Sequence, residues 1–237
     1  MRWSIADTRR HVEARFGRDH LARVAPSLNS LAERLSYAKY HYQEIQRLLD
    51  SYSRLHLVDK PLLVAIHGGD EVSREEFEVL MIEVGAHATA FVLSIHAVVD
   101  IMAHAVYLAL GCDLEVGALR ARDISAASVQ RRLRQIPDHA LIADAISSMC
   151  SDTRYKHIAA LSNMSKHQSI IKPVLNEDLT GSRPQWHEFR FTAFNYGGND
   201  YPEATIDSVF EPAYELASST IVEVGNRLNE ILVLERA

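Results

Sequence analysis

The sequence contains only two cysteines, Cys112 and Cys150, and neither has another cysteine close to it in the chain. A disulfide scaffold and a cysteine-rich zinc site both need more cysteines at closer spacing, so the sequence excludes both. The N-terminal stretch MRWSIADTRRHVEARFGRDH lacks the apolar central segment of a secretory signal. We therefore expect a cytoplasmic protein of bacterial type whose cysteines are small buried side chains.

The motifs of several common enzyme classes are also missing. The chain has no Gly-x-Ser-x-Gly elbow, no nucleophile signature around either cysteine, and no glycine-rich phosphate loop after a predicted strand. A net charge of −6 provides no overall basic field that would indicate nucleic-acid binding. Function therefore has to be sought in local features, and we expect no cofactor.

Apolar residues spaced three and four apart predict two long helices. The first covers about 27–57, and the second covers about 74–110, opened by a capping box of Ser73 and Glu76 and ended by Gly111. The stretch 88–110 is long enough to span a bilayer, but a carboxylate at its centre is costly in lipid. We therefore predict a buried core helix and no membrane association.

The rest of the chain predicts shorter helices, a β segment and a final helix. The helices cover 125–135, a segment opened by Pro137, about 153–170, and about 211–234. The segment 172–207 alternates in the manner of short strands, with a hairpin turn at GGND (197–200). The fold class is mainly α, an antiparallel helical bundle with a small β-hairpin or sheet appendage before the C-terminal helix. We divide a single domain into an N-terminal arm or helix, a bundle core, the β appendage and the last helix, at 1–26, 27–171, 172–207 and 208–237.

The predicted helix 153–170 carries a polar stripe. Lys156, Asn163 and His167 fall within about 40° of one face, and Lys166 flanks them. A partly buried asparagine or histidine without partners costs ~1–3 kcal/mol, and Asp100, deep in an apolar helix, is a natural partner. Two roles stay open. One is a ligand-binding strip of Lys156, Asn163, Lys166 and His167, and the other is a structural polar lock of Asp100, Asn163 and Lys166.

A second polar pattern lies on the helix before it. His96, Asp100 and His104 recur every four residues and can present metal ligands on one face. Di-iron bundles need a Glu-x-x-His on each of two helices, and zinc needs further ligands that the sequence does not identify. Hydrogen bonds between helices are favoured over a metal site here.

Two quoted segments resemble a known superfamily. FVLSIHAVVDIMAHAVY (91–107) followed by LSNMSKHQ (161–168) is similar to the HEPN helical bundles, the higher eukaryotes and prokaryotes nucleotide-binding domains. The likeness covers roughly 28–171 and is greatest to bacterial branches with a small residue and an aspartate on an early helix and Asn-x-x-Lys-His on a later one. The matching residues are Ser94, Asp100, Asn163, Lys166 and His167.

The resemblance implies a homodimer and, in catalytic members, a metal-independent ribonuclease marked by Arg, four to six residues, and His. In this chain Ala160, Leu161 and Ser162 occupy the arginine positions before His167. Other Arg–His pairs at suitable spacing are about as frequent as chance predicts. They are Arg15/His20, Arg34/His41, Arg132/His139 and Arg134/His139.

Without the arginine, we expect a non-catalytic HEPN-like protein that binds RNA, a nucleotide or a protein partner in a bacterial defence or stress setting. The alternative is a ribonuclease with His167 as acid/base and Lys166 or Lys156 in place of arginine, and with Asn163 as a further candidate. Aromatic residues of the β appendage could stack bases, although packing on the last helix is favoured. They are Trp186, Phe189, Phe191, Phe194 and Tyr196.

Overall fold

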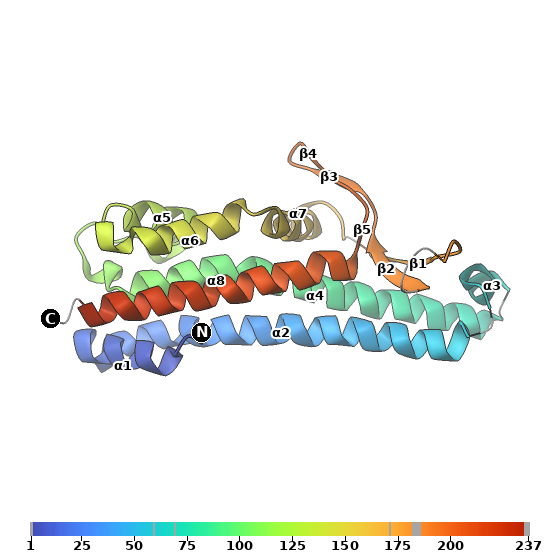
Figure 1. Cartoon of the computed structure of the whole chain (residues 1–237), viewed down its shortest axis with the longest axis horizontal. Helices are drawn as coiled ribbons and strands as arrows, with labels where there is room; N and C mark the ends of the chain where they lie inside the picture. The colour runs from blue at the N-terminus through green and yellow to red at the C-terminus, as the bar shows by residue number, and fades with distance from the viewer. Residues whose placement is uncertain (1, 59, 69, 171, 182–185, 235–237) are drawn as a thin grey trace. The chain divides into compact units, whose positions relative to one another are not determined.

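The structure is a computed structural model that describes residues 2–58, 60–68, 70–170, 172–181 and 186–234 (Figure 1). Ile171, at the predicted end of the bundle core, and both chain ends lie outside these ranges. The predicted mainly α class, with a small antiparallel β segment before the last helix, is confirmed. The helices are α1 (Ile5–Phe16), α2 (Arg18–His56), α3 (Leu62–His67), α4 (Glu71–Ala109), α5 (Ala126–Leu133), α6 (Ala140–Ser151), α7 (Thr153–His167) and α8 (Ile206–Leu234).

The chain divides into two compact units. The first unit comprises 1–36, 95–156 and 214–237, and the second comprises 37–94 and 157–213. Helices α2, α4, α7 and α8 each contribute residues to both units. This division does not test the predicted single-domain organisation, which stays a prediction.

In the first unit, Gly17 separates α1 from α2 with a φ of 86°, which favours glycine. As a result α2 begins at Arg18, well before the predicted start at 27, and Pro26 lies inside the helix. Val24 and Leu28, on either side of Pro26, are fully buried. Core packing therefore outweighs the hydrogen bond that proline cannot donate.

The first unit also contains the break between α6 and α7. Helices α5 and α6 lie side by side (Figure 1), joined through a 3₁₀ turn at Pro137–His139 that confirms Pro137 as a helix opener. Asp152 then adopts an extended backbone with ψ of 138° and ends α6. Helix α7 follows at once and ends at His167, before the predicted end at 170.

In the second unit, α4 begins at Glu71 because Asp70 caps it. The Asp70 carboxylate accepts hydrogen bonds from the backbone N–H and the hydroxyl of Ser73, both at 2.9 Å. The predicted capping box of Ser73 and Glu76 is therefore wrong. The carboxylate of Asp70, one turn before Ser73, is a better hydrogen-bond acceptor at the positive end of a helix than the Ser73 hydroxyl.

Two small antiparallel sheets belong to the second unit. Strands β1 (Val174–Glu177), β2 (His187–Phe191) and β5 (Ala204–Thr205) form one sheet in the order β1-β2-β5. Strands β3 (Phe194–Tyr196) and β4 (Asn199–Tyr201) form a hairpin through Gly197 and Gly198, with φ of 60° and 78°. The hairpin turn is confirmed, since two consecutive positive φ angles suit two glycines.

An aromatic cluster joins the sheet to the helices of the second unit. The rings of Phe91 on α4 and Phe210 on α8 stack with centroids 3.8 Å apart, and Phe191 on β2 lies 5.7 Å from Phe210. All three side chains are at most 1% exposed. Burial of Phe189 and Phe191 also confirms the predicted alternation along this strand.

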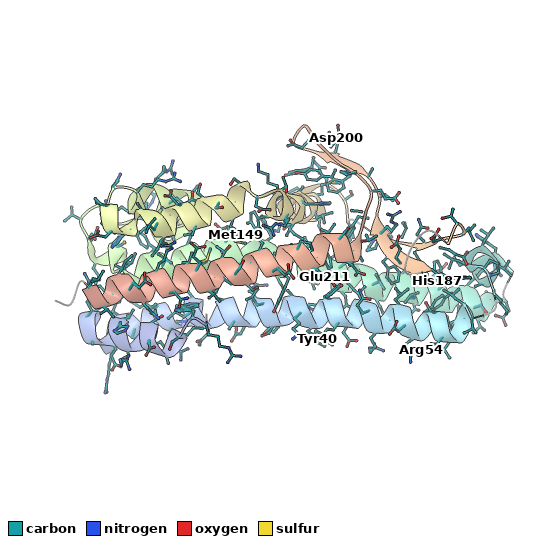
Figure 2. All side chains as sticks on the ribbon, in the orientation of Figure 1. Tyr40, Arg54, Met149, His187, Asp200 and Glu211 are labelled. Atoms are coloured by element: carbon teal, nitrogen blue, oxygen red, sulfur yellow. The ribbon has the colours of Figure 1, made fainter. Side chains whose placement is uncertain are left out.

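A hydrogen-bond group links α2 with α8 in the same unit. The Tyr42 hydroxyl lies 2.9 Å from the Asp207 carboxylate and 2.7 Å from that of Glu211, which is labelled in Figure 2. Burial and the two carboxylates raise the pKa of Tyr42. The phenol therefore keeps its proton and remains a hydrogen-bond donor between these helices.

Helix α4 is the one helix in the described ranges that is long and apolar enough to cross a membrane. Within its most apolar window, 67% of residues are buried inside the protein. Length and apolar composition are also typical of a core helix, and this burial agrees with that interpretation.

Candidate functional site

The C-terminal half of α7 combines a buried apolar side with exposed basic groups. Ile158 and Leu161 are at most 1% exposed in the second unit. Lys166 and His167 are exposed in the last turn, and Asn163 is partly buried. The expected partial burial of the stripe thus holds for Asn163 and is wrong for His167. Basic groups at this position interact favourably with the negative end of the helix.

The basic character extends beyond α7. From Thr153 to Asn176 the sequence contains no aspartate or glutamate. Within that stretch Lys156, in the first unit, and Lys166 and Lys172, in the second, are all exposed. The chain is mildly acidic overall, so this segment is a local exception to its charge.

Asp100 has a role that the sequence did not predict. In the first unit its carboxylate accepts a hydrogen bond of 2.9 Å from the backbone N–H of Ala126, the first residue of α5. Asp100 is exposed, so its expected deep burial is wrong. The lock with Asn163 and Lys166 joins residues of different units and stays a prediction.

The capping role predicts different results for two substitutions of Asp100. Asp100→Ala is expected to lower the free energy of unfolding by about 1 kcal/mol, because an N–H at the start of α5 loses its acceptor. Asp100→Asn should lower the free energy of unfolding by only about a few tenths of that loss, because the amide oxygen can still accept the hydrogen bond. Urea denaturation of both variants measures this, and an equal loss in both would indicate an essential ion pair instead.

The residues of the predicted metal-ligand pattern, His96, Asp100 and His104, each contact a different partner in the first unit. His104 Nδ1 lies 2.8 Å from the Ser27 hydroxyl. The His96 ring stacks on Tyr155 at 6.0 Å, and the Tyr155 hydroxyl donates to the His96 carbonyl at 3.1 Å. Burial raises the pKa of Tyr155, which keeps this donor protonated. As placed, the described residues include no group of three or more metal-ligating side chains.

The β3–β4 hairpin lies against α7 in the second unit (Figure 1). Phe194 and Tyr201 pair across the hairpin and stack at 4.7 Å, and the His157 ring lies 5.7 Å and 5.1 Å from them. Burial lowers the pKa of His157 and so favours its neutral form. The result is an aromatic cluster of Phe194, Tyr201 and His157 on α7.

The sequence identified only part of this aromatic arrangement. Phe189 and Phe191 belong to the core, and the contact of Phe191 with Phe210 agrees with the favoured packing on the last helix. Trp186 is 70% exposed. His157 and Tyr201 were missed. The glycine turn places Tyr201 opposite Phe194, but nothing in the sequence brings the hairpin to α7.

Comparison of the chain with protein-family models, curated proteins and solved structures finds no match. The candidate site is therefore defined by its own side chains. It consists of the exposed basic groups at the end of α7 and the aromatic cluster beside that helix, both in the second unit. Exposed cations bind phosphates and aromatic faces stack bases, so the two kinds of group each suit a polyanion that carries planar groups.

Proposed function

We propose that the protein is a non-catalytic, HEPN-like binding protein whose α7 segment binds single-stranded RNA. The observation that carries the proposal is the run from Thr153 to Asn176, which has exposed lysines and no carboxylate. Phosphates are bound by lysines that stay accessible to solvent, and neighbouring carboxylates would repel them. The homodimer, the cytoplasmic location and the defence or stress setting belong to the same proposal and rest on the HEPN resemblance alone.

RNA is favoured over a free nucleotide or a protein partner by the type of groups present. Many mononucleotide sites hold the phosphates with backbone N–H groups at a helix N-terminus, and the sequence has no glycine-rich phosphate loop of that kind. Spaced lysines suit successive phosphates, and the half-exposed rings of Phe194 and Tyr201 offer faces for stacking a base. A single strand presents both phosphates and unstacked bases.

Binding without cleavage is supported by the surroundings of His167. Its side chain is exposed, and the arginine that marks catalytic members is replaced by Ala160, Leu161 or Ser162. Charge stabilisation in ribonucleases depends on fixed cationic groups in a water-excluded site. His167 and Lys166 are both exposed to solvent, so they do not form a water-excluded site.

Removing basic groups from α7 and the segment after it is expected to weaken RNA binding. Lys166→Gln combined with Lys172→Gln should lower affinity about fivefold for each lost phosphate contact at 0.1 M salt. The slope of log affinity against log salt should fall by about 0.7 for each contact. Fluorescence anisotropy with labelled single-stranded RNA in EDTA measures both. Lys39→Gln, an exposed lysine on α2, is the matched control.

Other outcomes of the same assay have distinct meanings. Equal affinity in the double variant and the control would refute RNA binding by this segment, as would the absence of any binding to the labelled RNA. RNA cleavage that persists in EDTA and disappears in His167→Ala would show a ribonuclease and overturn the non-catalytic assignment.

A further inference from the structure

Two histidines of the second unit face each other directly. Nδ1 of His41 on α2 lies 2.8 Å from Nδ1 of His87 on α4, and both side chains are partly buried. The Tyr40 ring packs edge-on against both imidazoles, with centroids 5.2 Å and 6.2 Å away. A contact between these two atoms requires one protonated and one unprotonated nitrogen, so at most one imidazole is charged.

The helices that carry the pair also carry two carboxylates and one guanidinium close to it in sequence. Glu44 lies one turn after His41, and Glu83 lies one turn before His87. Glu44 accepts a hydrogen bond from Arg47 at 2.8 Å, and both carboxylates raise the pKa of that guanidinium. The contact between the two Nδ1 atoms already requires at least one neutral imidazole with a lone pair at Nδ1.

We propose that His41 and His87 form a binding site for a divalent transition-metal ion of the Cu²⁺ or Ni²⁺ type. Cis ligands about 2.0–2.1 Å from a square-planar or octahedral ion are about 2.8–3.0 Å apart. The separation of 2.8 Å between the two Nδ1 atoms matches that requirement. Imidazole is a preferred ligand for both ions, and an interhelix pair can hold it without a flexible loop.

Metal binding changes the protonation and hydrogen bonds of the pair in a defined way. The histidine that donates from Nδ1 shifts its proton to Nε2, and both rings rotate until the two lone pairs converge on the metal. The described side chains as placed offer no third ligand, so Glu44 has to exchange Arg47 for the metal. Glu83 and water complete the coordination. Arg47 therefore competes with the metal for carboxylate oxygens.

Copper titration of the full chain tests the site. Calorimetry and electron paramagnetic resonance with Cu²⁺ are expected to show a site with two nitrogen ligands. His41→Gln and His87→Gln should each lower affinity at least tenfold, and the double variant should lose less than the product of the two single losses, because the ligands act together. His67→Ala removes an exposed histidine on α3 and is the matched control for the other histidines of the chain.

The outcomes separate a metal site from a structural histidine pair. Unchanged copper affinity in His41→Gln and His87→Gln would overturn the proposal and leave an interhelix hydrogen bond only. Arg47→Gln is expected to tighten copper binding severalfold. An unchanged affinity in this variant would show that the carboxylates are not ligands of the metal. Circular dichroism of each variant distinguishes loss of ligand from loss of folding. RNA binding by α7 is measured independently, so either proposal can fail without the other.

Discussion

Replacing Phe210 with alanine is expected to lower the free energy of unfolding by about 3–5 kcal/mol, the largest effect of any single change proposed for this protein. Phe210 is fully buried and stacks on Phe91 at 3.8 Å, with Phe191 at 5.7 Å. The substitution removes apolar burial and ring contacts and leaves a cavity among three elements that cannot easily collapse. Denaturant unfolding followed by circular dichroism measures the change.

Two further variants show whether the position of Phe210 causes this loss. Phe210→Leu keeps most of the volume and should recover a large part of the stability. Trp186→Ala removes a larger aromatic side chain that is 70% exposed, and it should change stability by less than about 0.5 kcal/mol. Equal losses in Phe210→Ala and Trp186→Ala would contradict the assigned core of the second unit.

Gly111→Ala is expected to destabilise the first unit by about 2–5 kcal/mol for two additive reasons. Gly111 follows α4 with a φ of 70°, a conformation that residues with a Cβ rarely adopt. An added Cβ would also lie 2.6 Å from Cε1 of Phe16, much closer than van der Waals contact. The Phe16 ring or the end of α4 therefore has to move.

Gly117→Ala is the matched control for the backbone contribution. Gly117 has a φ of 81°, but an added Cβ meets nothing within 4 Å. Gly117→Ala should lower the free energy of unfolding by about 1–2 kcal/mol, which is the strain of the left-handed conformation alone. If thermal denaturation shows the same loss for both variants, contact with Phe16 contributes nothing to the requirement for glycine at 111.

The long helices were predictable because apolar periodicity is a local property of the chain. Their boundaries were less predictable, because each depends on competition among nearby groups. The first long helix was predicted to start at about 27, just after Pro26, yet the burial of Val24 and Leu28 continues α2 through that proline. Helix α8 begins at Ile206, earlier than the predicted 211, because the Thr205 hydroxyl accepts the backbone N–H of Ser208 at 3.0 Å.

The candidate site was also predictable only in part: the sequence indicates the spacing of its residues along a helix but not their burial or their distant contacts. Helical spacing placed Asn163 and His167 on one stripe, but spacing does not show how deeply that stripe is buried. The sequence also gave no sign that Asp100 would reach the first N–H of α5, because that contact depends on the path of the intervening loop. His41 and His87 are 46 residues apart, and no local pattern connects them.

The sequence by itself determined the mainly α class, the glycine turn at Gly197 and Gly198, and the basic segment without carboxylates around α7. These follow from periodicity, backbone preference and composition, which act over a few neighbouring residues. Only the tertiary structure decided that Lys166 and His167 are exposed, that the hairpin rings lie against His157, and that His41 faces His87. The physical reason is that burial and contacts between distant residues depend on how separate elements pack.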